Sequence, residues 1–503
     1  MTLARKAASL LLLISLIAFG GCGDNGAKPT PTSASNLRIG ATVPPNALDP
    51  TTNNLAAIPQ ALLYNVYETL VKLDAEGTIR PLLAKEWSVS ADGLTYTFTL
   101  RDGATFTSGA PVNAAAVVAS IQRIQNDPAV TSVNKTQMAV VSAATAKDDK
   151  TVVVTLARPS NGWLYNMTGS AGIVLDPAHL ADLATKPVGS GPYTVKTWNE
   201  GDSLVLARNP HYWGLAAAFD TVTFRYYTDP NAENAAMLAG DLDIISDVTA
   251  PQALNQFSDA SRYQVIKGTS NGEIVLGLNN ANAALSDVRV RQAICYAIDR
   301  QALMDSVWAG EGLLIGSMVP PTDPWFQDLS DAYPFNPALA KTLLAQAGFG
   351  EGLTLRLRVP TIPYATGSET FIVSQLKDIG ITVQVDELDP TRWADEVYTQ
   401  GNYDMTIIAH VEPRDIAKWA DPTYYWHYSN TTFQGLIAQA DESPADQYIP
   451  LMQQAAKLLS DDAAGDFLWL LPSIIVATPN LTGIPQNKIA LSFDLSAIAS
   501  RTG

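Results

Sequence analysis

The segment covering residues 188–213 constrains the fold of this chain more than any other stretch. The sequence Gly-Ser-Gly-Pro at 189–192 predicts a sharp bend, since glycine and proline favour the backbone angles of turns. Two runs rich in β-branched and apolar residues follow, Tyr193–Trp198 and Ser203–Ala207, and the loop between them contains a glycine. This pattern predicts a β-hairpin. Nothing in the segment indicates catalysis, so its expected role is to return the chain to a sheet begun near the N-terminus.

Local patterns elsewhere predict both helices and strands. Apolar residues recur at helical spacing over Gln60–Leu70, which predicts a helix. Glu86–Ser90 and Leu94–Leu100 alternate between polar and apolar residues, which predicts a second hairpin. Asn113 and Asp287 are placed to cap helices that begin directly after them. Beyond the first hairpin, strand patterns alternate with helical ones, including a strand over 240–245. This order predicts a parallel sheet covered by helices.

Four segments carry a resemblance to a known family. Residues 188–213 have the pattern GSGPY…W…GD.L.L.RNP.YW, and residues 94–123 have the pattern L.Y.F.LR.G..F..G.PV.A..V..S..R. Residues 276–303 and 336–348 supply two further motifs. With these motifs the sequence resembles the extracellular solute-binding proteins of family 5, the peptide- and nickel-type binding components of ABC importers.

The resemblance implies an α/β fold with two lobes, similar to periplasmic binding proteins of type II and cluster C, and an additional small α+β domain. We expect residues 37–69, 186–270 and 480–503 to form lobe I and residues 271–479 to form lobe II. Residues 70–185 would be the inserted small domain. The chain would cross between the lobes twice and form a hinge there, and ligand would favour closure of the lobes.

The N-terminus has the layout of an export signal over residues 1–21. Basic Arg5-Lys6 precedes an apolar core, Leu10–Phe19, and small residues precede Cys22. This arrangement resembles a lipobox, in which the cysteine is acylated, so Cys22 would anchor the protein to the outer face of the cytoplasmic membrane. Residues 22–36 would form a flexible tether. The alternative is an ordinary secretory signal with an incidental cysteine.

The cysteine content and the net charge limit the expected thiol chemistry and the expected partners of the protein. The chain contains only two cysteines, Cys22 and Cys295, and Cys295 lies within a predicted helix, so we expect it to be a free, buried thiol. The formal net charge of −17 argues against nucleic acid as a partner, because the sequence has no basic stripe to displace counterions from phosphates. The expected partners are a small ligand, the membrane and ABC permease subunits, and the expected oligomeric state is a monomer.

The sequence contains no motif that predicts an enzyme. It has no G-x-S-x-G elbow, H-E-x-x-H helix, Walker loop or zinc-spaced cysteine pair. Its four histidines are scattered along the chain, so we expect no metal site and no cofactor. An exported hydrolase that uses dispersed carboxylates remains as an alternative.

The ligand-binding loop is expected after the strand predicted over 404–408. The carboxyl ends of strands in α/β sheets present ligand-binding loops, and the following residues are dense in charged and aromatic side chains. Five residues of this stretch are candidates for ligand binding: Asp415, Glu412, Arg414, His410 and Trp419.

Family relatives that bind peptides place a carboxylate here against the ligand's amino group. That resemblance implies Asp415 or Glu412 as the partner of an ammonium group and Trp419 as a wall of the pocket. Arg414 suits a ligand carboxylate, because a guanidinium matches two oxygens at once. The alternative is that the charged residues form a solvated surface cluster and that Trp419 belongs to the core.

On lobe I, the resemblance implies that the segment Thr52–Ala57, which follows Pro50, lines the ligand cleft mostly through backbone groups, with Asn54, Leu55 and Ala56 as candidate ligand-binding residues. Short peptides are the expected ligands, delivered to a membrane permease without chemical change. Nickel or other metal chelates, sugars and other small solutes are the alternatives, because the fold does not determine the ligand.

Overall fold

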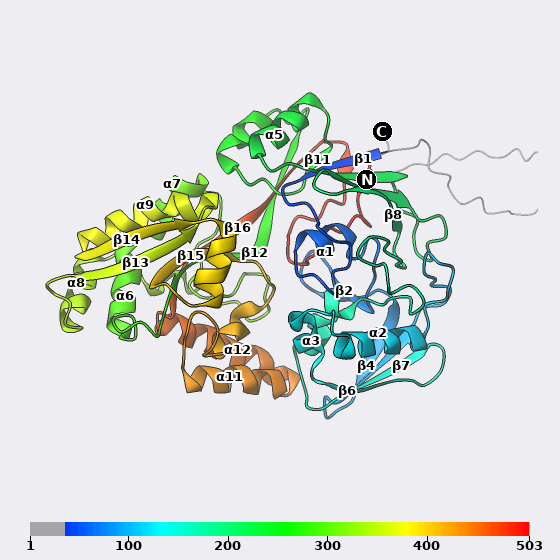
Figure 1. Ribbon diagram of the computed structural model, residues 1–503, viewed down its shortest axis with the longest axis horizontal. Coiled ribbons are helices and arrows are strands. Elements are labelled where there is room, and N and C mark those ends of the chain that lie inside the picture. Colours follow the sequence, from blue (N-terminus) through cyan, green and yellow to red (C-terminus); the bar gives the residue numbers. More distant parts are fainter. Residues whose placement is uncertain (1–35, 502–503) are drawn as a thin grey trace, which may run out of the picture. The chain divides into compact units, whose positions relative to one another are not determined.

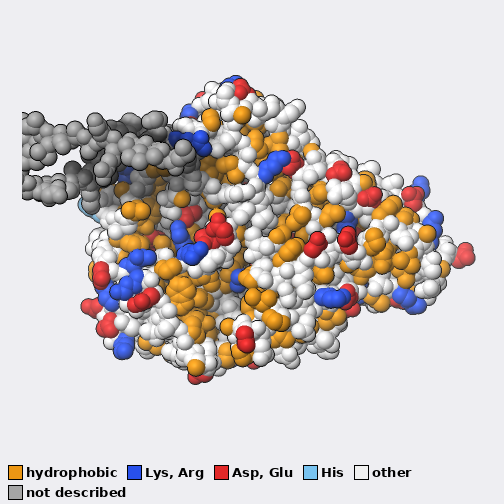
Figure 2. Space-filling model, turned by 180° about the vertical axis from the view of Figure 1, so that it is seen from behind, with side chains coloured by type: hydrophobic (Ala, Val, Ile, Leu, Met, Phe, Trp, Pro, Cys, Tyr) orange, Lys and Arg blue, Asp and Glu red, His pale blue; other side chains and the backbone are white. Residues whose placement is uncertain are grey.

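The computed structural model describes residues 36–501 (Figure 1). The expected export signal, Cys22 and the tether up to residue 35 lie outside the described residues. Within the described range, every helix is too short or too polar to cross a lipid bilayer. On the face shown in Figure 2, Lys and Arg side chains lie interspersed with Asp and Glu side chains.

A mixed ten-stranded sheet forms the framework of the described chain, in the order β14-β13-β15-β12-β16-β11-β1-β10-β9-β8. Its strands are β1 (Asn36–Ala41), β8 (Tyr193–Asn199), β9 (Ser203–Arg208), β10 (Thr221–Tyr226), β11 (Ile244–Ile245), β12 (Gln264–Leu278), β13 (Leu353–Pro360), β14 (Ile381–Leu388), β15 (Met405–His410) and β16 (Gly465–Ala477). Strand β1 pairs in parallel with β10 and β11, and β13 pairs in parallel with β14 and β15. The expected parallel sheet is therefore only partly right, because β12 and β16 run antiparallel to each other and to neighbouring strands.

Strands β12 and β16 are the longest of the sheet and connect its two ends (Figure 1). Their pairing has a register shift between Thr269 and Glu273. On one side of the shift, Phe467–Leu470 pack into the cores beside β13 and β15. On the other side, Ile474–Ala477 pack into the cores beside β1 and β10. The boundaries of lobe I and lobe II given above stay a prediction.

The hairpin expected from residues 188–213 is confirmed by β8 and β9. Strand β9 pairs with β10, which lies beside β1, so the hairpin returns the chain to its first strand. The two glycines serve close packing here and do not adopt left-handed angles. A Cβ on Gly189 would lie 1.9 Å from the Val66 carbonyl oxygen, and one on Gly191 would lie 2.5 Å from that of Asn65.

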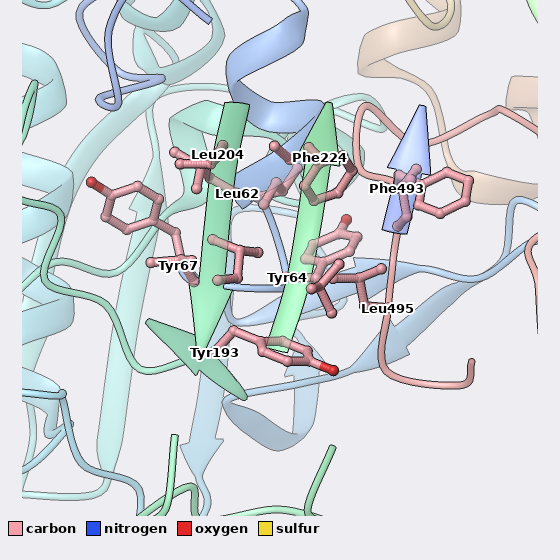
Figure 3. Close-up of a cluster of buried hydrophobic side chains, with 14 of the residues drawn as sticks. Leu62, Tyr64, Tyr67, Tyr193, Leu204, Phe224, Phe493 and Leu495 are labelled. Carbon is pink, nitrogen blue, oxygen red and sulfur yellow. The ribbon is translucent and has the colours of Figure 1, made fainter. Parts of the chain in front are cut away.

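The helix expected over Gln60–Leu70 is wrong in its extent. Helix α1 (Ala57–Leu62) ends early, and Tyr64 adopts a positive φ of 64°. The reason is tertiary, because the Asn65 carbonyl accepts a hydrogen bond from the Tyr193 N–H and the Asn65 amide donates to the Phe493 carbonyl. Figure 3 shows Tyr64, Tyr193 and Phe493 in the same buried cluster. Similarly, the strand expected over 240–245 is reduced to β11.

The segment expected as a small domain contains a sheet of its own, in the order β4-β5-β7-β6. The elements of this part are β2 (Val71–Leu73), β3 (Ile79–Pro81), β4 (Ala84–Val89), β5 (Thr95–Leu100), α2 (Ala114–Asn126), α3 (Ser132–Met138), β6 (Val141–Ala146), β7 (Thr151–Leu156) and α4 (Trp163–Asn166). The hairpin β4–β5 is confirmed. So is the cap, since the Asn113 side chain accepts a hydrogen bond of 3.0 Å from the Ala116 N–H.

Helices pack around the sheet in the remaining part of the chain (Figure 1). They are α5 (Pro230–Ala239), α6 (Val288–Ala297), α7 (Arg300–Trp308), α8 (Pro337–Gln346), α9 (Pro363–Asp378), α10 (Pro390–Trp393), α11 (Thr431–Glu442) and α12 (Ala445–Asp461). Asp287 caps α6 as expected, by accepting a hydrogen bond from the Arg289 N–H. Cys295 in α6 is confirmed as a buried free thiol.

Candidate functional site

The candidate site begins where strand β15 ends, at His410. This residue pairs across the sheet with Glu273 of β12. Side chains of directly opposed residues in antiparallel strands lie on one face, with their Cβ atoms about 4.5–5.5 Å apart. The sheet therefore places the Glu273 and His410 side chains on the same face, although the two residues are far apart in the sequence.

Asp415 is the next member of the site and starts the short helical turn η5 (Asp415–Ala420). Its side chain is buried, and its Oδ2 lies 3.0 Å from His410 Nδ1. The other ring nitrogen, His410 Nε2, lies 2.7 Å from the Tyr425 hydroxyl. The second carboxylate oxygen, Asp415 Oδ1, has no hydrogen-bond partner among the described residues. The histidine is thus held at both nitrogens, while Asp415 keeps one oxygen for another group.

Arg414 precedes Asp415 in the left-handed conformation, with φ 58°. Its guanidinium lies over two aromatic rings, 3.5 Å from the ring centroid of Tyr165 and 4.9 Å from that of Trp325. Its Nε lies 3.6 Å from Asp323 Oδ1. The arginine therefore already has one carboxylate and two aromatic partners within the protein.

Glu273 and Asp323 add two buried acids to the site. Burial, with Asp415 as the next cause, raises the pKa of Glu273 well above its usual range. Burial also raises the pKa of Asp323 to about 7, although Arg414 acts to lower it. Both shifts follow from moving a carboxylate out of water and close to other acids. The site is consequently acidic and poorly solvated.

The two other residues expected in this loop, Glu412 and Trp419, differ in their exposure to solvent. The Glu412 side chain is 56% exposed and pairs with Lys418 at 3.1 Å. Trp419 is 1% exposed and stacks on Trp426, with ring centroids 5.0 Å apart. Trp419 thus lies in the core, which is the alternative considered for it above.

Three residues of this loop also lie close enough together to hold a metal ion. One ligand atom each from His410, Glu412 and Asp415 lies within 4.8 Å of the others. Both ring nitrogens of His410 already have hydrogen-bond partners, however. A metal ion would have to replace one of these partners, so the geometry favours a hydrogen-bonding role.

The lobe I segment lies just before α1. Asn54 and Ala56 are exposed and Leu55 is partly buried. The carbonyl groups of Leu55 and Ala56 accept the hydrogen bonds that start α1. No hydrogen bond or ion pair between described residues joins this segment to loop 410–415.

Sequence reasoning missed Glu273, Asp323 and Tyr165. One signal was available for Glu273, since it immediately precedes the apolar run Ile274–Leu278. An acid directly before a run of apolar residues typical of a strand that is buried on both faces has a large desolvation cost, and such a position is a candidate for function. Asp323 and Tyr165 carry no such local signal.

Comparison with known proteins agrees with this architecture. Residues 78–435 match the family model described as bacterial extracellular solute-binding proteins, family 5 Middle. The chain is 31% identical over 369 residues to the glutathione-binding protein GsiB of Salmonella typhi, and the match covers 72% of this chain and 71% of that protein. The resemblance found in the four motifs is therefore confirmed.

Two solved structures share the fold. One is NikA from Brucella suis in complex with Fe(III)-EDTA, with a TM-score of 0.81, 23% identity and coverage of 93% of this chain and 100% of that chain. The other is the ABC transporter-associated periplasmic binding protein DppA from Helicobacter pylori in complex with the peptide STSA. Its TM-score is 0.80 at 22% identity, with coverage of 93% and 98%. The expected two-lobed α/β fold is confirmed.

Proposed function

Because the chain belongs to the bacterial extracellular solute-binding proteins of family 5, we propose that it captures short peptides between two hinged lobes and delivers them to the permease of an ABC importer. The observation that carries the peptide assignment is Asp415, at the start of η5 in the loop after β15. Its carboxylate is buried, is oriented by His410, and keeps one oxygen without a partner among the described residues. A peptide's terminal ammonium group supplies the charge and the N–H donors that this oxygen lacks.

The same proposal assigns the other roles. The ligand is delivered without chemical change, so the protein acts without catalysis. It acts as a monomer. Acylated Cys22 would hold it at the outer face of the cytoplasmic membrane. Replacing Cys22 with alanine should then move the protein into the soluble fraction, and retention in the membrane fraction would contradict the anchor.

The ligand class is also supported by relatives. GsiB is described as binding glutathione, and the DppA structure contains a tetrapeptide. Glutathione and ordinary peptides share a primary ammonium group beside a short, amide-containing chain. Metal chelates are the second candidate, because His410, Glu412 and Asp415 have ligand atoms within 4.8 Å of one another.

Calorimetric titration of the wild type with glutathione, Ala-Ala-Ala and nickel chloride tests the proposal directly. We expect one of the two peptides to bind and Asp415→Asn to weaken it more than tenfold, because the substitution removes the charge and keeps the size. Loss of a buried charge pair costs about 2–5 kcal/mol. Glu412→Gln, on an exposed pair, should change affinity by less than about 1 kcal/mol.

Two outcomes would contradict the peptide assignment. One is saturable binding of nickel by a wild type that binds neither peptide. The other is peptide binding by Asp415→Asn within threefold of wild type.

A further inference from the structure

A short segment of the expected small domain contacts the end of helix α11 at several points. The segment is Arg158–Gly162, directly before α4, and its partners lie between Ala440 and Ser443, where α11 ends. Between 279 and 283 positions of the sequence separate the bonded residues. We call this contact the clasp.

Asp441 is the acceptor at the centre of the clasp. Its Oδ2 accepts a hydrogen bond of 2.6 Å from the Arg158 guanidinium. Its Oδ1 accepts one of 2.8 Å from the Ser160 hydroxyl and one of 3.1 Å from the Gly162 N–H. The ion pair with Arg158 is exposed and contributes little by itself, whereas the bonds from Ser160 and Gly162 are partly buried. One carboxylate thus holds three donors of the segment.

Asn161 makes contacts in the reverse direction. Its side-chain amide donates hydrogen bonds of 2.9 Å to the Ala440 carbonyl and 2.8 Å to the Ser443 carbonyl. Its backbone N–H donates to the Asp441 carbonyl at 2.8 Å. The last carbonyl groups of a helix have no partner within the helix, so Asn161 satisfies groups that α11 leaves open. Each side of the clasp therefore supplies partners that the other side needs.

The clasp connects two apolar cores that are built separately. Behind the segment, Trp163 is buried in the core of the expected small domain, with its ring centroid 4.7 Å from that of Tyr96. Behind α11, Phe433 and Ala440 are buried in the core that contains Trp419. Among the described residues, these two cores have no member in common. A contact made of hydrogen bonds and ion pairs can separate without exposing an apolar core to water.

The clasp also lies beside the candidate site. Helix α4 follows it directly, and the ring of Tyr165 in α4 lies 3.5 Å from the Arg414 guanidinium. The residues from 158 to 166 therefore reach the opposite part of the molecule twice, at the end of α11 and at the loop after β15. With the lobe boundaries predicted above, the chain connects the lobes through β12 and directly after β16. Both ends of the small domain join lobe I, so the clasp is a noncovalent connection from that side to lobe II.

We propose that the clasp holds the two lobes closed whether or not ligand is bound. This inference rests on the proposed closure of the lobes and adds a contribution that comes from the protein alone. Every partner in the clasp is a protein group, so its contribution does not depend on the chemistry of the ligand. A ligand that binds the closed form then binds more tightly, because the apparent dissociation constant falls as the closed fraction of the free protein rises.

Asp441→Ala tests the proposal, since it removes the acceptor of three donors. Small-angle scattering without ligand should give a larger radius of gyration than wild type. Calorimetric titration with glutathione and Ala-Ala-Ala should show an affinity at least fivefold lower, by the same factor for each peptide that binds wild type. Asn161→Ala removes the other half of the clasp and should act in the same direction. Asp461→Ala is the matched control, because this exposed acid pairs with Lys457 inside its own helix. Its substitution should change neither quantity.

The possible results separate this inference from the proposed function. If a peptide binds wild type while ligand-free Asp441→Ala keeps the wild-type radius of gyration, only this inference fails. Equal expansion of Asp461→Ala would also overturn it. If neither peptide binds wild type, the proposed peptide function fails, and expansion of Asp441→Ala without expansion of the control still supports the clasp. If Asp441→Ala does not fold, the same measurements on Asn161→Ala decide the matter.

Discussion

Glu68 and Glu273 are both buried glutamates, but their surroundings are opposite. Glu68 Oε2 accepts hydrogen bonds from the Ser190 hydroxyl at 2.7 Å and the Trp213 indole at 3.0 Å, and its Oε1 accepts one from the Tyr212 hydroxyl at 2.8 Å. Glu273 Oε2 has no partner among the described residues. Thus the described residues supply three donors to Glu68 and none to Glu273 Oε2.

This difference separates an acid whose hydrogen bonds stabilise the fold from one that is buried without a donor to its Oε2 among the described residues. All three partners of Glu68 come from segment 188–213, from the bend before the hairpin and from the stretch after it. The segment is therefore more than a means of returning the chain to the sheet, since one buried carboxylate ties its two ends together. Glu273 instead lies near other acids, and Asp415 and Asp323 add to burial in raising its pKa.

The largest expected effect is on stability when Glu68 is truncated. Glu68→Ala removes the acceptor of the buried Ser190 hydroxyl and of the partly buried Tyr212 hydroxyl and Trp213 indole N–H. A buried unpaired group costs about 1–3 kcal/mol, and a partly exposed one less. We expect the free energy of unfolding at pH 5 to fall by at least about 3 kcal/mol. Glu273→Ala removes no hydrogen bond to that oxygen and should cost less than half as much. Urea denaturation of both variants measures the comparison, and equal losses would refute it.

Whether the sequence predicts a structural feature depends on how far apart in the sequence the contacting residues lie. The hairpin β8–β9 and the caps Asn113 and Asp287 follow from neighbouring residues, and the structure confirms them. Helix α1 ends early because of contacts with Tyr193 and Phe493, which no local pattern contains.

The site shows the same limit. The loop after β15 is predictable, since the end of a strand and a run of charged residues are local features. The pairing of Glu273 with His410 depends on the register between β12 and β15. Register between distant strands is set by the whole sheet, so sequence reasoning reached Asp415 and missed Glu273.

The second prediction concerns pH. Burial raises the pKa of Glu68 to about 7, although its three donors act to lower it. The folded protein then keeps a proton that the unfolded chain releases, so this residue's contribution to stability falls as the pH rises from about 4.5 to about 7. Glu68→Gln lacks the titrating group. The difference in unfolding free energy between wild type and this variant should therefore shrink by at most about 3 kcal/mol over that range. A difference that stays constant from pH 4.5 to 8 would contradict this account.

The smallest effect is expected for Glu273→Gln, which should raise the free energy of unfolding rather than lower it. Burial and Asp415 raise the pKa of Glu273 well above its usual range, so the folded chain holds this proton to higher pH than the unfolded chain does, and wild type loses stability as the pH rises above about 4.5. Glutamine removes this cost without breaking a hydrogen bond to the free oxygen. We expect the free energy of unfolding to rise by about 1 kcal/mol at pH 7 and to be unchanged at pH 4, where both states are protonated. Thermal and urea unfolding at the two pH values, with Glu68→Gln beside it, measure the effect. A loss of more than about 1 kcal/mol at both pH values would show that Glu273, like Glu68, stabilises the fold.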